Sequence, residues 1–102
     1  MATRAGLGIK ELLADKREAI LRIAAQYGAS NVRVFGSVAR GEATSDSDID
    51  FLVIFKSDYT LWDHIGLKQA LEDLLGRRVD VVLEKELREG FRAYFLRDAM
   101  PL

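Results

Sequence analysis

The sequence predicts an α/β fold of the α+β kind, with one small mixed sheet flanked by helices. Three short apolar runs, at residues 32–35, 49–55 and 79–83, are rich in the β-branched and aromatic residues typical of strands. Longer segments between them repeat apolar residues every three or four positions, as amphipathic helices do. Because the two kinds of element alternate along 102 residues, we expect a single domain over residues 1–102, built as packed layers.

The first helix is expected over residues 9–27, where apolar side chains recur at helical spacing, and Gly28 is placed to end it. A short strand over residues 32–35 follows. Residues 36–47 are rich in Gly, Ser, Thr and Asp, which predicts a loop with one helical turn at its start.

The second strand is expected over residues 49–55, and a second helix over residues 61–75. Thr60 and Asp63 form a weak capping-box pattern at the start of this helix, and Gly76 is placed to close it. Together these signals predict a strand, a short connection and a helix in this part of the chain.

The third strand is expected over residues 79–83, followed by a last helix that Pro101 would end. Apolar residues on one stripe mark this helix: Leu87, Phe91, Tyr94 and Phe95. We expect the aromatic residues to pack into the core, with a partner interface as the alternative.

The composition excludes several classes of function. With 15 Lys and Arg against 16 Asp and Glu, the net charge is −1, so no stable nucleic-acid binding is expected. Without cysteine and with one histidine, the chain has no disulfide framework, thiolate metal site or multi-histidine zinc site. The longest strongly apolar run, residues 51–55, is too short to cross a membrane, and the N-terminus lacks an apolar signal segment, so a cytoplasmic protein is expected.

Three aspartates occur where strands are expected. Asp48 and Asp50 are two residues apart at the start of the second strand, so their side chains point to the same face, with Cα atoms about 7 Å apart. Asp80 interrupts the third strand and would join them if that strand pairs beside the second. Three ionised carboxylates repel one another unless a cation lies between them. Oxygen ligands alone favour Mg²⁺ or Mn²⁺, and two such ions form a clamp for phosphoryl or nucleotidyl transfer.

Each aspartate also has an ordinary structural interpretation. Asp48 suits a turn, Asp50 a charged strand edge, and Asp80 an ion pair with Arg78. An isolated Asp-x-Asp is usually part of a solvated loop, so the functional interpretation depends on the segment that precedes it.

That segment is a Gly-Ser turn, at the point where the first strand is expected to lead into a helical turn. Gly36 allows the backbone to approach an anion closely, and the exposed N–H groups with the Ser37 hydroxyl suit a triphosphate. Arg40 follows Ser37 by three residues, within reach of the same phosphates. The alternative is a simple strand-to-helix turn in which Ser37 caps the helix.

Together, Gly36 and Ser37, ten intervening residues, and Asp48-Ile-Asp50 spell G-S-x₁₀-D-x-D. This pattern resembles the signature of the polymerase-β-like nucleotidyltransferase superfamily, and the string GSVARGEATSDSDIDFLV resembles its minimal nucleotidyltransferase branch. The resemblance covers about residues 32–83, and Asp80 matches the place of the family's third carboxylate. It implies the nucleotidyltransferase fold.

The resemblance also implies a role for each matching residue. Gly36 and Ser37 would hold the β- and γ-phosphates of a nucleoside triphosphate, with Arg40 as a helper. Asp48 and Asp50 would bind two Mg²⁺ ions, or Mn²⁺, and Asp80 would bind the catalytic ion and help to activate the acceptor hydroxyl. An acceptor oxygen would attack the α-phosphate and release pyrophosphate.

Single-domain members of this branch resemble the antitoxins of HEPN–MNT toxin–antitoxin pairs. The resemblance implies a protein adenylyltransferase that moves AMP from ATP onto a tyrosine of a HEPN ribonuclease toxin encoded nearby. Two alternatives stay open: a nucleotidyltransferase acting on a small molecule or an RNA end, and a non-catalytic antitoxin that neutralises its toxin by occlusion. No residue in the sequence indicates which nucleobase is selected.

Overall fold

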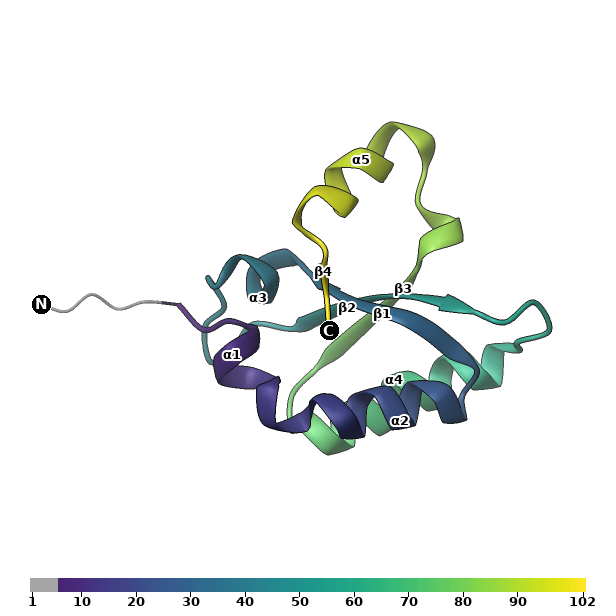
Figure 1. Ribbon diagram of the computed structural model, residues 1–102, viewed down its shortest axis with the longest axis horizontal. Helices are drawn as coiled ribbons and strands as arrows, with labels where there is room; N and C mark the ends of the chain where they lie inside the picture. The colour runs from purple at the N-terminus through teal and green to yellow at the C-terminus, as the bar shows by residue number, and fades with distance from the viewer. Residues whose placement is uncertain (1–5) are drawn as a thin grey trace, which may run out of the picture.

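Four strands form one mixed sheet in the order β3-β2-β1-β4 in the computed structural model, which describes residues 6–102 (Figure 1). The strands are β1 (Ala29–Phe35), β2 (Ile49–Phe55), β3 (Val79–Leu83) and β4 (Met100–Pro101). β2 pairs antiparallel with β1 and parallel with β3, and β4 pairs antiparallel with β1. The predicted small mixed sheet is therefore confirmed.

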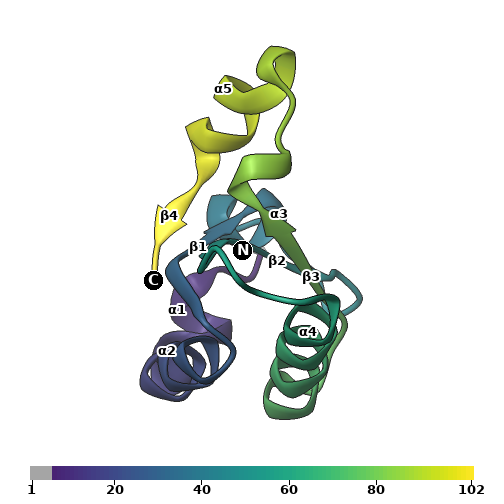
Figure 2. The same cartoon turned by 90° about the vertical axis from the view of Figure 1, so that its right-hand side faces the viewer.

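Helices lie on both sides of this sheet. They are α1 (Ile9–Leu12), η1 (Ala14–Lys16), α2 (Arg17–Gln26), α3 (Gly36–Arg40), α4 (Leu61–Leu75), η2 (Glu84–Glu86) and α5 (Glu89–Asp98). Figures 1 and 2 show α2 and α4 side by side beneath one face, with α5 standing on the opposite side. We call the side that carries α5 the open face. Within residues 6–102, no helix is both long and apolar enough to span a bilayer.

The main core lies between the sheet and the pair of helices α2 and α4. Side chains at alternate positions of β2, such as Ile49, Phe51 and Val53, are almost completely buried there. They meet Ile20 from α2 and Leu67 from α4, which are also fully buried. Because this layer fixes the strands from one side, the other side of the sheet is free to carry polar groups.

The predictions for β2, β3 and α4 are confirmed to the residue. At the start of α4, the Asp63 N–H donates to Thr60 Oγ1 at 3.3 Å and the Thr60 N–H donates to Asp63 Oδ2 at 2.8 Å, which is the predicted capping box. Gly76 ends the helix with a φ of 68°, a left-handed conformation that favours glycine.

The prediction of one continuous helix over residues 9–27 is wrong. The segment is divided into α1, η1 and α2, and the break follows Leu13, which is fully buried. The apolar repeat skips one turn here, because Lys16 and Arg17 occupy the positions where the next apolar residues would fall. With no apolar side chain to hold that turn against the core, a tighter 3₁₀ turn replaces it.

The C-terminal segment also differs from the prediction. Beyond the helix, Met100 and Pro101 pair with β1 as a short edge strand, a place where proline is tolerated because its missing N–H faces away from the sheet. Phe95 packs edge-on against Phe35, with ring centroids 5.6 Å apart. Core packing is wrong for Phe91 and Tyr94, which are 57% and 60% exposed.

Candidate active site

Asp50 and Asp80 are brought together by the parallel pairing of β2 and β3. They are direct register partners, so their Cα atoms are separated by one strand spacing of about 4.8 Å. Asp50 alternates with the core-facing residues Ile49 and Phe51, which places its side chain on the open face. The carboxylates of Asp50 and Asp80 are therefore neighbours on one face of the sheet.

Asp48 lies just before β2 and makes a different contact. Its Oδ1 lies 3.2 Å from Arg78 Nε, and both side chains are largely exposed. The expected alternative of an Arg78 ion pair with Asp80 is therefore replaced by one with Asp48. In the conformation described for residues 6–102, no three side chains of the Asp, Glu or His type stand together as a metal-binding group.

Gly36 lies directly against Asp50. The last residue of β1, Phe35, pairs with Asp50, and Gly36 begins α3 with a φ of 74°. A Cβ at this position would lie 2.5 Å from Asp50 Oδ2. Glycine is thus required twice, once by the backbone conformation and once by the close approach of the carboxylate. Ser37 falls inside α3 and is not its cap, since Phe35 occupies that position.

Arg40 ends α3 and joins it to two acidic side chains. Its Nε lies 2.9 Å from Glu42 Oε1 and its Nη1 lies 3.3 Å from Asp98 Oδ2 on α5. A pocket of about 130 Å³ lies between this ion pair, Gly36 and the aromatic side chains of α5. Arg40 is close enough to Asp50 for its charge to lower the pKa of that carboxyl group.

The environment of Asp50 opposes its negative charge. Burial, together with the neighbouring charges of Asp80 and Asp48, raises the pKa of this carboxyl group from 3.8 to about 6, against the smaller effect of Arg40. A half-buried carboxylate beside two others is electrostatically unfavourable until a positive charge is placed among them. The donor set contains only oxygen atoms, which suits Mg²⁺.

Arg77 holds the loop that leads to these aspartates, a role that the sequence analysis missed. Its Nη1 donates to the carbonyl oxygens of Thr44 and Ser47, both at 3.1 Å. No local sequence pattern predicts this contact, because Arg77, just after α4, is 30 residues away from Ser47 in the sequence. The loop is further closed by the Thr44 N–H, which donates to Ser47 Oγ at 2.9 Å.

We expect Arg77→Ala to loosen this loop. The two lost hydrogen bonds should lower the local opening free energy by about 1–2 kcal/mol, so amide hydrogen exchange over residues 44–47 should accelerate about tenfold. Arg78→Ala is the matched control, since Arg78 is 80% exposed in its side chain and contacts Asp48 rather than the loop carbonyls. Equal exchange rates in the two variants would contradict this assignment.

Comparison with known proteins identifies relatives over nearly the whole chain. The profile of the nucleotidyltransferase domain family matches residues 16–102. The chain is 40% identical over 89 residues to the protein adenylyltransferase MntA of Thermococcus cleftensis, an alignment that covers 87% of this chain and 86% of that protein.

Solved structures share the fold. One, assigned to the minimal nucleotidyltransferases, superposes with a TM-score of 0.83 at 53% identity and covers 94% of this chain and 97% of its own. A structure of the MntA–HpeT toxin–antitoxin superposes with a TM-score of 0.70 at 20% identity, over 85% of this chain and 71% of that one. At that lower identity the second likeness concerns the fold alone.

Proposed function

This chain belongs to the nucleotidyltransferase family, in its minimal branch, and from that premise we propose that it is an antitoxin that adenylylates its toxin. The proposed reaction transfers AMP from ATP to a tyrosine of a HEPN ribonuclease toxin in the cytoplasm. The tyrosine oxygen forms a bond to the α-phosphorus, the bond to the β-phosphate oxygen breaks, and pyrophosphate leaves.

The observation that carries this proposal is the contact of Gly36 with Asp50, with Asp80 in register beside it. A backbone turn suited to phosphates thus lies next to the carboxylates suited to a cation. The relative named protein adenylyltransferase supports a protein acceptor, and the name MntA recurs in the MntA–HpeT toxin–antitoxin pair.

In this proposal each part of the site has one task. Gly36 and Ser37 hold the β- and γ-phosphates, and Arg40 assists after exchanging one of its carboxylate partners for phosphate. Asp48, Asp50 and Asp80 hold Mg²⁺, or Mn²⁺, for which Asp48 leaves its ion pair with Arg78. Bound divalent cations supply charge stabilisation for in-line transfer. Asp80, an exposed residue of β3, faces the acceptor and orients its hydroxyl group.

The test uses the purified chain, the protein encoded by the adjacent gene, and labelled ATP with Mg²⁺. We expect the label on the partner, whose intact mass should rise by one or more AMP units. EDTA should stop the transfer, and added Mg²⁺ or Mn²⁺ should restore it. Label in RNA or in a small molecule instead would replace the protein acceptor by the corresponding alternative.

The double variant Asp48→Asn with Asp50→Asn separates catalysis from occlusion. We expect it to fold, to bind the partner, and to transfer no label, leaving cells unprotected against the toxin. Full protection by this variant would mean that the toxin is neutralised by binding alone. A matched control is Asp58→Asn, which changes an exposed aspartate that contacts Lys56 at 4.0 Å.

A further inference from the structure

The open face continues beyond the carboxylates toward the far ends of β2 and β3. Ile54 follows Asp50 by four residues, and Glu84 follows Asp80 by four. Within β2, an even number of residues returns the side chain of Ile54 to the face that carries Asp50, and four residues span about 13 Å. Glu84 lies just beyond β3, at the start of η2. An ion pair between Glu84 and Arg33 of β1 independently places Glu84 on this face.

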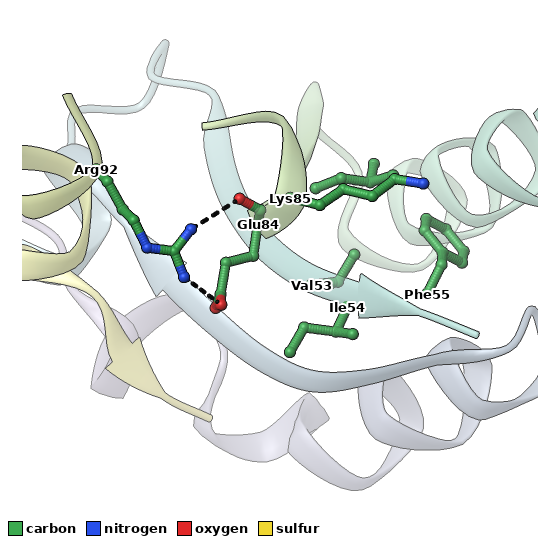
Figure 3. Close-up of a pocket in the computed structure, with 7 residues that line it drawn as sticks. Val53, Ile54, Phe55, Glu84, Lys85 and Arg92 are labelled. Atoms are coloured by element: carbon green, nitrogen blue, oxygen red, sulfur yellow. Dashed lines mark hydrogen bonds and ion pairs between the residues drawn. The ribbon is translucent and has the colours of Figure 1, made fainter. Parts of the chain in front are cut away.

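A pocket of about 250 Å³ opens at this point, and we call it the Arg92 pocket (Figure 3). Its wall is apolar and comes from residues 53–55 of β2 and from Leu83, with Ile54 40% exposed. Its charged rim consists of Glu84, Lys85 and, from α5, Arg92. The pocket thus combines an apolar surface with hydrogen-bonding groups at its edge, as small-molecule sites do.

Both sides of the rim are held in place. The Arg92 guanidinium donates from Nη2 to Glu84 Oε2 at 2.8 Å and from Nη1 to the Glu84 carbonyl oxygen at 3.4 Å, as Figure 3 shows. Opposite it, Lys85 Nζ lies 4.4 Å from the ring centroid of Tyr59, and that ring stacks on Phe55. A planar cation fixed beside an apolar wall is a good stacking surface for a flat aromatic ring.

We propose that the Arg92 pocket receives the nucleobase of the nucleoside triphosphate. This inference rests on the proposed function, which lays the phosphates across the sheet from Gly36 on the β1 side to Asp80 on β3. In this proposal the sugar and the base extend from the α-phosphate along the strands, toward the Arg92 pocket at the far ends of β2 and β3. The smaller pocket beside Gly36 and Arg40 lies at the phosphate end instead.

Glu84 gives the pocket a means of reading the edge of the base. Hydrogen bonding and the charges of Arg33 and Arg92 lower the pKa of its carboxyl group, so it stays ionised and accepts hydrogen bonds. A carboxylate favours a base edge that presents an amino group, as adenine does, over one that presents only a carbonyl oxygen.

Calorimetry tests the proposal without any acceptor, with Mg-ATP and Mg-tripolyphosphate as the two ligands. Ile54→Trp fills the pocket, and Arg92→Ala removes its stacking rim. Both variants should bind Mg-ATP about tenfold to a hundredfold more weakly, the range expected when a base loses its stacking surface, with unchanged affinity for Mg-tripolyphosphate. The control is Ile65→Trp, which enlarges a residue of similar exposure (48%) on α4, away from the open face.

Two results would overturn the proposal. Unchanged Mg-ATP affinity in both variants would leave the base elsewhere, and an equal loss for both ligands would assign the pocket to the phosphates. If the wild-type chain binds neither ligand, the proposed function itself fails, so this outcome is distinct from the others. Arg92→Ala keeps the test decisive if Ile54→Trp does not fold.

Discussion

Replacing Asp50 with asparagine is expected to slow nucleotidyl transfer strongly and, at neutral pH, to make the folded protein more stable. Asp50 pairs with Asp80, touches Gly36 and is the most buried of the three aspartates. We expect the rate of transfer to fall about a thousandfold, as when a preorganised charge is removed from a reacting centre. A labelled-ATP transfer assay measures this loss.

The gain in stability follows from the direction of the pKa shift. Because the folded-state pKa of Asp50 is raised to about 6, the folded protein holds this proton more tightly than the unfolded chain does. The free energy of unfolding therefore falls as the pH rises from about 4 to about 6. Above pH 6 the folded protein bears the full cost of the ionised Asp50 carboxylate. Allowing for solvent screening of a half-exposed group, Asp50→Asn should raise the free energy of unfolding by about 1–2 kcal/mol at pH 7.

Urea denaturation at pH 4 and at pH 7 checks this prediction. The difference between Asp50→Asn and the wild type should be small at the lower pH and large at the higher one. Asp58→Asn, at an exposed position, should show no such dependence. A variant that is destabilised at both pH values would contradict the electrostatic account.

The second large effect is expected from Gly36→Ala. The new methyl group would lie 2.5 Å from Asp50 Oδ2, in a backbone conformation with a φ of 74° that L residues disfavour. The left-handed conformation alone costs about 1–2 kcal/mol, and displacement of the carboxylate adds to it. We expect a loss of about 2–4 kcal/mol in the free energy of unfolding, by analogy with overpacking of a tight contact. Transfer should fall about a hundredfold, because a shift of about 1 Å at a reacting centre has that effect.

Gly41→Ala is a closely matched control, because Gly41 has the same φ of 74° and an added Cβ there meets no atom within 4 Å. Gly41→Ala should lower the free energy of unfolding only by the cost of the left-handed backbone conformation, and the rate of transfer should be almost unchanged. The pair Gly36→Ala and Asp50→Ala adds a second check, since shortening Asp50 makes room for the new methyl group. Purely additive losses of stability in that double variant would show that the two residues are not in contact.

Local signals in the sequence were sufficient for the elements with strong periodicity. The predicted bounds of β2, β3 and α4 agree with the structure because each of them combines an apolar pattern with a clear start or stop, such as Thr60 and Gly76. The break after Leu13 and the edge strand at Met100 were not predicted. Both depend on contacts with distant parts of the chain, the first with the core and the second with β1.

The candidate site also has features that the sequence predicted and features that only the folded structure shows. The spacing from Gly36 to Asp50 is a local pattern, and it identified the family that the comparisons then showed. Other contacts join side chains that meet only after folding. They are the ion pair of Arg78 with Asp48, the hydrogen bonds of Arg77 to the loop carbonyls, and the two ion pairs of Arg40. No periodicity or spacing rule encodes which of several cations reaches a given carboxylate.

The sequence by itself therefore determined the class of fold, the family and the residues that carry charge and flexibility, because these depend on residue type and short-range spacing. Only the tertiary structure decided that Asp50 and Asp80 are neighbours and that Gly36 touches Asp50. It also decided that the open face continues into the Arg92 pocket. Strand order and register set these distances, and they result from packing the whole sheet against α2 and α4, which no single segment specifies.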